Sequence, residues 1–489
     1  MAVSGEIAAE SVFENLQCQN TFIEPIRFCT DQLPTYCTGT RLGILKLFGI
    51  FQPMHILVLT DNFIPEIAAP SFRAHDHAKR WLEAGHEVTV VTCVPNWPRG
   101  EPFPGYKNRL YQEEWIDGIR VIRLWSYMSA NKGFLRRTLD YVSFMLSAIL
   151  FFRRYPKFDV ILATSPQFLT AVAGWAISIL RRRPWVFEIR DLWPASIRAV
   201  GAADGLLIRS LERLELFLYR KANRLVTLTD AFKHDLVKRG IDRAKIDVVT
   251  NGVDTSQFNR AAVTYDARAR LGILPEKFLA GYVGTTGMAH GLKTLLDAAE
   301  ICRQPANDSS SATGDIHFLI MGEGAERQRL EADTQRRGLS NVQFSDRVPH
   351  AEVPNYLAAL DLAIIHLRPD PVFETVIPSK LFEFMALRVP VLMAVAGEAA
   401  EIVTETKCGV CIAPGDGRVM ADAIIELSTD ATVLTRMGES GERAAASHYG
   451  RCTKAQQMLQ SLCRTLGREF SVDAAVETPT PGHLPSRAA

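Results

Sequence analysis

The sequence lacks the features that would mark a membrane-spanning, secreted or nucleic-acid-binding protein. No apolar run approaches the roughly 20 residues that a membrane helix needs, and the longest candidate, Phe144 to Phe152, is followed by Arg153 and Arg154. The first 53 residues show no charged start, apolar middle and small-residue cleavage site, so we expect no signal peptide. A formal net charge of only +1 argues against a dedicated nucleic-acid binder.

Cysteine and histidine also give no sign of a disulfide framework or a metal site. The nine cysteines are scattered, and an odd number of free thiols fits a reducing cytoplasm. Cys408 and Cys411 form a C-x-x-C without a second pair, and we expect a buried strand there, ending at Ile412. His75 and His77 do not share a helix face, so we expect them to be solvated. No carboxylate cluster calls for a divalent metal ion, and we expect no cofactor.

The length and the pattern of strands and helices predict two large α/β domains. At 489 residues the chain is too long for one ordinary core. The strand His55 to Thr60, the helix Ser71 to Ala84 and the strand Val88 to Thr92 form a βαβ unit, which implies parallel strands. Further strands, each followed by a helical stretch, are expected at 160–163, 185–189 and 224–228. A doubly wound domain therefore covers about residues 54–260.

The same alternation restarts after residue 260. Strands are expected at 279–283, 317–321, 362–366, 389–395 and 409–412, with helical segments between them. A second Rossmann-like domain therefore covers about residues 261–440. By composition, we expect the extension 1–53 and the Pro-, Ala- and Thr-rich tail 467–489 to be disordered.

Two glycine-rich turns follow strands of the second domain. The first runs from Gly284 to Gly291 and leads into a helix, where backbone amides and the positive end of a helix dipole can bind phosphate. The second is Met321-Gly322-Glu323-Gly324, in which Glu323 can accept hydrogen bonds from hydroxyl groups. Because the carboxyl ends of parallel strands meet at one edge of the sheet, we expect both turns to converge on one crevice. Either turn alone would also suit an ordinary tight connection.

The segment Ile377 to Ala386 has the strongest signal for a nucleotide-sugar site. Pro378 suits the first position of a helix, and Lys380 and Glu383 follow on one face of it. A cation near helix amides can hold a diphosphate, and a carboxylate can hold a ribose diol. The alternative is an i,i+3 surface ion pair, which is worth only a few tenths of a kcal/mol.

In this order, these segments resemble the family 4 glycosyltransferases, which are retaining enzymes of the GT-B fold. The resemblance is strongest to the branch that builds bacterial capsule, O-antigen and colanic-acid-type polysaccharides, and it covers about residue 54 to residue 462. The matching stretches are Phe63-Ile64-Pro65-Glu66 with Arg73, Arg190-Asp191-Leu192-Trp193-Pro194, Asn251-Gly252-Val253-Asp254 with Phe258, and Pro378-Ser379-Lys380-Leu381-Phe382-Glu383.

The resemblance implies two Rossmann-like doubly wound parallel-sheet domains that face each other across a cleft. The first would bind the acceptor, with Pro65 and Arg73 on that side; the second would bind the nucleotide-sugar, and a helix at 441–466 would cross back to the first. Glu383 would hold the donor ribose. Arg190 and Asp191 stand where many relatives carry a His-Asp pair beside the transferred sugar. The remaining implied donor-binding residues are Gly284, Thr285, His290, Lys380 and Ser379 around the diphosphate, Glu323 near the nucleotide, and Val348 beside the base.

Three positions depart from the pattern of the family. The usual pair of glutamates, with seven residues between them, would put its first member at Thr375, whereas Glu374 is one place away. Thr285 and His290 stand where many relatives have Arg and Lys. Arg388 stands where the end of the helix is usually Gly.

The resulting expectation is a retaining glycosyltransferase that moves a sugar from a nucleotide-sugar, with UDP the commonest carrier in this branch, to a polyprenyl-linked saccharide. Two alternatives remain open: a nucleotide-sugar epimerase of the same architecture, and a catalytically inactive sugar-binding or scaffold protein. Residues 134–157 combine Arg136, Arg137, Arg153 and Arg154 with an apolar run. This pattern suits either a buried helix with charged ends or a membrane-surface helix, and we favour peripheral attachment at the cytoplasmic face of the cell membrane.

Overall fold

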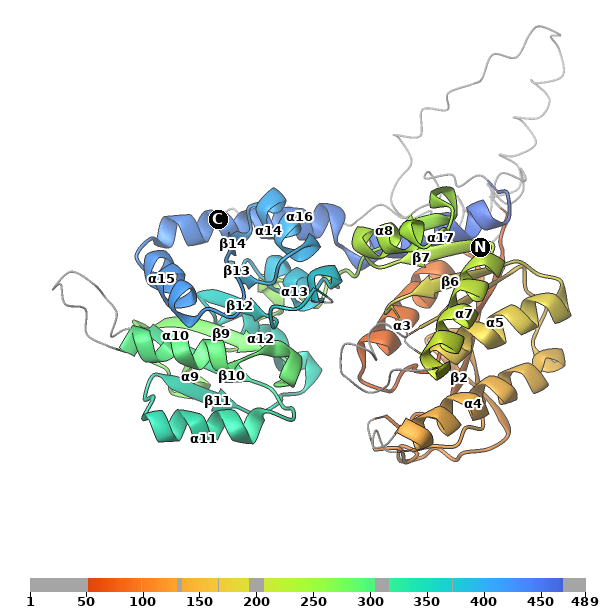
Figure 1. Cartoon of the computed structure of the whole chain (residues 1–489), viewed down its shortest axis with the longest axis horizontal. Coiled ribbons are helices and arrows are strands. Elements are labelled where there is room, and N and C mark those ends of the chain that lie inside the picture. The colour runs from red at the N-terminus through yellow and green to blue at the C-terminus, as the bar shows by residue number, and fades with distance from the viewer. Residues whose placement is uncertain are drawn as a thin grey trace, which may run out of the picture. The chain divides into compact units, whose positions relative to one another are not determined.

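The computed structural model describes residues 52–97, 99–129, 134–165, 167–192, 206–303, 316–371 and 373–468. The two terminal segments predicted to be disordered lie almost wholly outside these ranges. Two mostly parallel sheets with flanking helices make up the described chain (Figure 1), which confirms the predicted fold class. Within these residues no helix combines the length and apolarity needed to cross a membrane.

The first domain is built on an eight-stranded sheet in the order β3-β4-β2-β1-β5-β6-β7-β8. Its inner strands are buried on both faces, and their sequences are accordingly nearly continuous runs of aliphatic residues. The chain adds strands on one side of β1 and then returns to add β5 on the other side. The parallel strands are β1 (His55–Leu59), β2 (Glu87–Cys93), β4 (Ile119–Leu124), β5 (Val160–Thr164), β6 (Trp185–Ile189), β7 (Arg224–Thr227) and β8 (Ile246–Val248). The helices of this domain are α3 (Ala69–Glu83), α4 (Phe134–Leu150), α5 (Phe168–Arg181), α7 (Leu206–Lys221) and α8 (Asp230–Lys238).

A β-hairpin at the edge of this sheet was not predicted. The strand β3 (Tyr111–Ile116) pairs antiparallel with β4, and Asp117 and Gly118 join them with φ angles of 50° and 78°. An Asp-Gly pair suits such a turn because both of its central residues need positive φ. The Asp-Gly pair was therefore a sign of a hairpin in the sequence, although a pattern of parallel βαβ units contains no hairpin.

The second domain is built on a six-stranded parallel sheet in the order β11-β10-β9-β12-β13-β14. Its strands are β9 (Phe278–Val283), β10 (Ile316–Met321), β11 (Val342–Ser345), β12 (Leu362–His366), β13 (Val391–Ala394) and β14 (Gly409–Cys411). Its helices are α9 (Ala267–Leu271), α10 (Lys293–Arg303), α11 (Arg327–Arg337), α12 (Val353–Ala358), α13 (Lys380–Ala386), α14 (Glu398–Thr406), α15 (Gly417–Ser428) and α16 (Ala431–His448). The predicted buried strand around Cys411 is half right, since Cys408 is buried but the Cys411 side chain is exposed.

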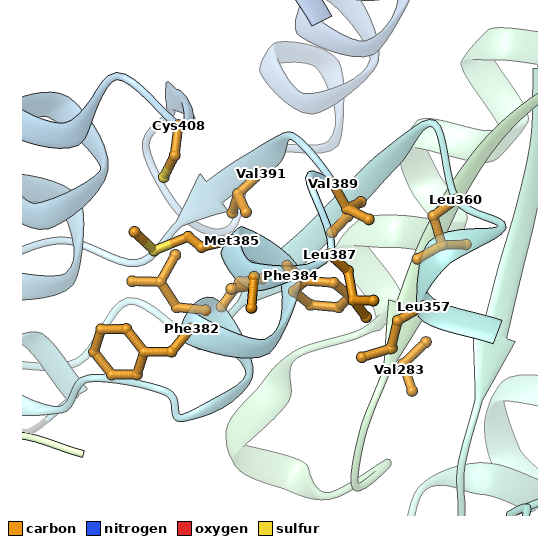
Figure 2. Close-up of a cluster of buried hydrophobic side chains, with 14 of the residues drawn as sticks. Val283, Leu357, Leu360, Phe382, Phe384, Met385, Leu387, Val389, Val391 and Cys408 are labelled. Carbon is orange, nitrogen blue, oxygen red and sulfur yellow. The ribbon is translucent and has the colours of Figure 1, made fainter. Parts of the chain in front are cut away.

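The short helix α13 is anchored in the second core by its apolar side chains. Phe382, Phe384 and Met385 lie among Val391, Cys408 and residues from neighbouring elements, as Figure 2 shows. Because these side chains fill the buried face of α13, Lys380 and Glu383 are left on its remaining, half-buried face. The core thus fixes the direction in which the two charged groups point.

The two chain crossings between the domains lie side by side. Val253 forms a parallel bridge with Gly450, and its amide donates to the Tyr449 carbonyl at 2.8 Å. The helix predicted at 441–466 is therefore interrupted at residues 449–450. After the interruption, α17 (Arg451–Thr465) packs against α3 of the first domain, where Trp81 Nε1 donates to the Ala455 carbonyl at 3.0 Å.

Candidate functional site

The two glycine-rich turns of the second domain lie directly against each other, as predicted. The amide of Gly284 donates to the Met321 carbonyl at 2.9 Å, and the amide of Thr286 donates to the Glu323 carbonyl at 3.0 Å. Gly322 has a φ of 134°, and a Cβ at this position would lie 1.9 Å from the Gly284 carbonyl oxygen. Glycine is therefore required here by both backbone conformation and close approach.

Among the described residues, some backbone amides of the first turn remain unpaired after these hydrogen bonds with the second turn. In the part of the chain that the structure describes, the amides of Thr285 and Gly287 donate to no acceptor. The Tyr282 hydroxyl donates to the Thr285 carbonyl at 2.7 Å and holds the turn from below. Unpaired amides that point from a turn are suited to an anion such as phosphate.

Lys380 lies over this turn. A Cβ on Gly284 would be 3.3 Å from Lys380 Cε, so any larger residue at position 284 would crowd the lysine. The predicted contribution of α13 amides stays a prediction: Leu381 N donates to the Pro378 carbonyl and Phe382 N to the Ser379 carbonyl, and the amides of Ser379 and Lys380 donate to no acceptor among the described residues. The side chain of Ser379 makes no capping bond. Positive charge at this point therefore comes from Lys380, and available amides come from both the turn and the start of α13.

Glu383 is held in a partly dehydrated position next to two cations. Burial raises the pKa of Glu383, while Lys380 and Arg451 act in the opposite direction. Arg451 begins α17 and was not singled out from the sequence. It also donates to Asp76 and to the Gly252 carbonyl, and these two bonds fix its guanidinium beside the crossing.

The charge of Lys380 influences the pKa of two histidines. Burial lowers the pKa of His290, and electrostatic interactions with His366 and Lys380 lower it further. The centroid of the His290 ring lies 5.8 Å from that of the Tyr282 ring. Burial also lowers the pKa of His350, with Arg451, Lys380 and Arg347 adding to the effect. His350 was missed by the sequence reading, although it follows the predicted Val348 by two residues. The charge of Lys380 therefore acts on both histidines, while the His350 ring itself packs against Phe72 and Phe258.

The other predicted donor-side residues lie at different depths. Glu323 is exposed, and its main-chain carbonyl accepts a hydrogen bond that joins the two turns. Val348 packs against the core of the second domain. Glu374 is exposed, and a Cβ on Gly397 would lie 2.1 Å from its carbonyl oxygen. Arg388 adopts a φ of 58°, a conformation that favours glycine, which explains why Gly suits this position in relatives.

Arg73, predicted as a contact on the acceptor side, is buried and paired within the first domain. It is 8% exposed, and its guanidinium donates to Glu188 at 2.7 Å and to the carbonyls of Val249 and Thr250, both at 2.9 Å. His77, predicted to be solvated, is buried beside this pair. Arg73 therefore ties α3 to β6 and to the end of the first domain.

Arg190 and Asp191 follow β6 at its carboxyl end, and both are half-buried. The amide of Arg190 donates to Ser165 Oγ at 2.7 Å, and its Nε atom has no partner among the described residues. Burial lowers the pKa of Arg190 to about 10, against the attraction of Glu188. Among the described residues, no hydrogen bond or ion pair joins Arg190 to Lys380 or Glu383. Pro65 is exposed, next to Glu66, whose carboxylate accepts from the amides of Asn96 and Trp97.

Two family models match the two domains. One, described as a glycosyl transferase 4-like domain, matches residues 70–252, and the other, glycosyl transferases group 1, matches residues 264–444. WcaI of Escherichia coli K12, which is named as a glycosyl transferase of colanic acid biosynthesis, is 25% identical over 344 residues, which are 68% of this chain and 81% of WcaI. The 2-deoxystreptamine N-acetyl-D-glucosaminyltransferase of Streptomyces fradiae is 25% identical over 299 residues, which are 58% of this chain and 68% of that protein.

Solved structures share the fold at low sequence identity. Sucrose-phosphate synthase from Thermosynechococcus elongatus has a TM-score of 0.66 at 19% identity, over 85% of this chain and 99% of that one. HepE from Anabaena, solved in complex with UDP-glucose, has a TM-score of 0.60 at 19% identity, over 84% of this chain and 100% of that one. These likenesses establish the two-domain GT-B fold.

Proposed function

Because this chain belongs to the family 4 glycosyltransferases, we propose that it transfers a sugar from a UDP-sugar to a lipid-linked saccharide with retention of configuration, in the synthesis of a cell-surface polysaccharide. One observation carries the donor part of this proposal. Lys380 lies over a turn whose Thr285 and Gly287 amides are unpaired among the described residues. This combination provides one full positive charge and two N–H donors for a diphosphate.

The chemistry of the proposed step makes the departing group the point that needs stabilisation. As the bond between the anomeric carbon and the phosphate oxygen breaks, the sugar becomes cationic and negative charge grows on the nucleoside diphosphate. Fixed donors aimed at that charge lower the barrier because they need no reorganisation. Lys380 and the turn amides would stabilise the phosphate, and Glu383 would accept from the ribose hydroxyls. Since these groups already supply the charge, we propose that transfer needs no divalent metal ion.

The proposal for UDP and for a polysaccharide product draws on the relatives. HepE has been solved with UDP and with UDP-glucose, and WcaI is named for colanic acid biosynthesis. In the first domain, Arg190 would face the transferred sugar or its acceptor, because its Nε is unpaired at the carboxyl end of a parallel strand. Asp191 would lie beside it.

Binding and turnover together test the donor. In a thermal-shift panel of UDP-, ADP- and GDP-sugars, we expect the UDP-sugars to raise the melting temperature most, since a ligand at 100 times its Kd adds about 2.7 kcal/mol. The same samples are then assayed without acceptor for slow release of UDP. Binding with release supports a transferase. Binding without release indicates an inactive sugar-binding protein, and interconversion of free nucleotide-sugars indicates an epimerase.

We also propose that the first domain attaches to a membrane surface. One face of α4 carries Phe144 and Ala148 into the core, whereas Leu146 and Leu150 on another face are 49% and 76% exposed. The neighbouring end of α5 exposes further apolar residues, Ile179 and Leu180. Exposed arginines occur at the start of α4, just after it, and just after α5: Arg136, Arg137, Arg153, Arg154, Arg182 and Arg183. Apolar side chains beside cations suit an anionic bilayer and would bring the site close to a lipid-linked acceptor.

A further inference from the structure

His366 connects the first glycine-rich turn to the loop after β14. It ends β12, is 2% exposed, and its Nδ1 atom lies 2.6 Å from the His290 carbonyl oxygen. On its other side, the Gly415 amide donates to Nε2 at 3.1 Å. A carbonyl accepts and an amide N–H donates, so Nδ1 carries the proton and Nε2 does not. The two partners therefore define a neutral imidazole with one tautomer, and burial also lowers the pKa of His366.

The hydrogen bond from His366 holds the C-terminal end of the first turn. The other glycine-rich turn does not hold this end. The hydrogen bonds to Met321 and Glu323 involve Gly284 and Thr286, at the beginning of the turn. At its end, the Arg368 amide donates to the Ala289 carbonyl at 2.9 Å, and His366 takes the next carbonyl along the chain. The unpaired amide of Gly287 lies between these two points of attachment, whereas that of Thr285 lies between Gly284 and Thr286, which the other loop holds.

The fit around the ring is close. Gly291 follows His290 with a φ of 56°, and a Cβ at Gly291 would lie 3.1 Å from His366 Cε1. The imidazole thus packs against the backbone at the place where the turn enters α10. A rotation of the ring would break both of its hydrogen bonds, so the side chain acts as a rigid spacer between two backbone segments.

We propose that His366 is a positioning residue for the donor diphosphate, a role that rests on the proposed glycosyltransferase function. Through its bond to the His290 carbonyl, it holds the turn in the shape that presents the Thr285 and Gly287 amides and the His290 ring to phosphate before the donor arrives. The shape of the turn is then set in the empty protein. Less conformational freedom has to be given up when the diphosphate binds.

Two substitutions separate this role from simple filling of the core. His366→Asn keeps an N–H donor near the position of Nδ1 and loses the acceptor for Gly415. His366→Gln keeps an acceptor near the position of Nε2 and loses the donor to His290. Each variant gives up one buried hydrogen bond, so both should lose similar stability in thermal unfolding. They differ only in whether the His290 carbonyl is still held.

The measurement is calorimetric titration of the full chain with UDP and with uridine. We expect His366→Gln to weaken UDP binding about ten-fold and His366→Asn to weaken it less than about three-fold, because only the first loses the bond to the turn. Uridine, which has no phosphate, should bind all three proteins equally. In turnover, the glutamine variant should raise the donor KM with little change in kcat.

Equal UDP affinity of the two variants would overturn the inference, and so would equal loss of UDP and uridine binding. A wild-type protein that binds no nucleoside diphosphate would instead refute the proposed function itself. A further measurement does not depend on the variants folding. The ¹⁵N resonances of His366 in the wild type should show a neutral ring protonated at Nδ1, and a proton at Nε2 would contradict the proposed geometry.

Discussion

At the scale of single residues, Glu383 combines a carboxylate, partial burial and two neighbouring cations. Burial raises the pKa of Glu383, and Lys380 and Arg451 oppose that rise. A carboxylate that is partly removed from water forms stronger hydrogen bonds to a ligand than one that is fully hydrated. The environment therefore suits a group that accepts from two ribose hydroxyls.

Glu383→Ala should reduce the affinity for the UDP-sugar about ten-fold or more, because a hydrogen bond to a charged acceptor is worth about 1.5–3 kcal/mol. Calorimetric titration measures the loss, and the unfolding transition should remain cooperative. Glu439→Ala is the matched control, since Glu439 is an exposed carboxylate on α16. Unchanged donor affinity in Glu383→Ala would remove Glu383 from the site.

Lys380→Ala should weaken UDP and the complete UDP-sugar by the same factor, because the proposed partner of the ammonium is the diphosphate that both contain. We expect a loss of about ten-fold or more for a charge-assisted contact, with uridine unaffected. Lys293→Ala serves as the control, since Lys293 is 64% exposed and pairs with Asp297 one helical turn away. A loss confined to the sugar-bearing ligand would place Lys380 at the other end of the donor.

The positions of individual residues could be predicted from the sequence where their neighbours are local, and their roles stay predictions. Lys380 and Glu383 lie on one short helix, and the structure places Lys380 over Gly284 as the motif implied. The pairing of Arg73 could not be predicted, because its partner, Glu188, is 115 positions away in the sequence, and no local pattern shows that the guanidinium is already occupied. Arg451 and His366 were missed for the same reason, since their partners come from other elements.

At the scale of elements, the buried pair of Arg73 and Glu188 ties α3 to β6. Removing one partner of a buried ion pair leaves the other uncompensated and costs about 3–5 kcal/mol. We therefore expect Arg73→Ala to lower the free energy of unfolding by about that amount in urea denaturation at neutral pH. Arg120→Ala is the control, because Arg120 is 29% exposed in its pair with Glu113, and such pairs contribute about 0–1 kcal/mol.

The contribution of this pair should depend on pH in a defined direction. Burial alone would raise the pKa of Glu188. The charges of Arg73, Arg190 and His77 outweigh burial and lower this pKa from 4.5 to about 2. A carboxylate with a lowered pKa contributes its full stabilisation above its ordinary pKa and loses it as the pH falls toward the folded value. The difference between wild type and Arg73→Ala should therefore shrink from pH 4.5 to pH 2. A difference that grows in this range would show that Glu188 is not the partner that matters.

Most strands of both sheets were placed within one or two residues, because buried parallel strands are nearly continuous apolar runs with clear ends. The hairpin of β3 and β4 was missed because β3 is an edge strand with a mixed, half-exposed sequence. The interruption between α16 and α17 was missed because it depends on the bridge between Val253 and Gly450, which only the folded chain brings together. Local patterns thus predicted the elements, and long-range contacts set their interruptions.

At the scale of the whole molecule, the exposed surface of α4 and α5 predicts salt-sensitive binding to anionic membranes. Each Lys or Arg near an anionic surface contributes roughly 1 kcal/mol, and buried leucines add to this. We expect the protein to sediment with vesicles that contain anionic lipid, less so at high salt, and weakly with neutral vesicles. Equal partitioning in every condition would exclude the electrostatic part, and no binding at all would exclude attachment.

Substitutions locate the membrane surface on the first domain. The double variant Leu146→Gln and Leu150→Gln should lower vesicle binding and leave UDP binding unchanged, because both side chains point to solvent. Leu274→Gln is the control, since Leu274 is 55% exposed in the second domain. Equal loss of vesicle binding in the control would mean that exposed apolar area in general, and not this surface, causes attachment.

The bridge between Val253 and Gly450 also gives the chain the connectivity of a host with an inserted guest. Residues 254–449 leave the first domain and return to it at one point, so the second domain is the guest, and β8 and α17 both belong to the host. A short linker from the residue before Val253 to Gly450 would therefore close the host after excision, because the Val253 side chain packs in the core of the guest. The guest, with its own sheet and core, could be exchanged for another with a different nucleotide preference. Under the proposed roles of the two domains, donor and acceptor choice are separable by recombination at these two adjacent junctions.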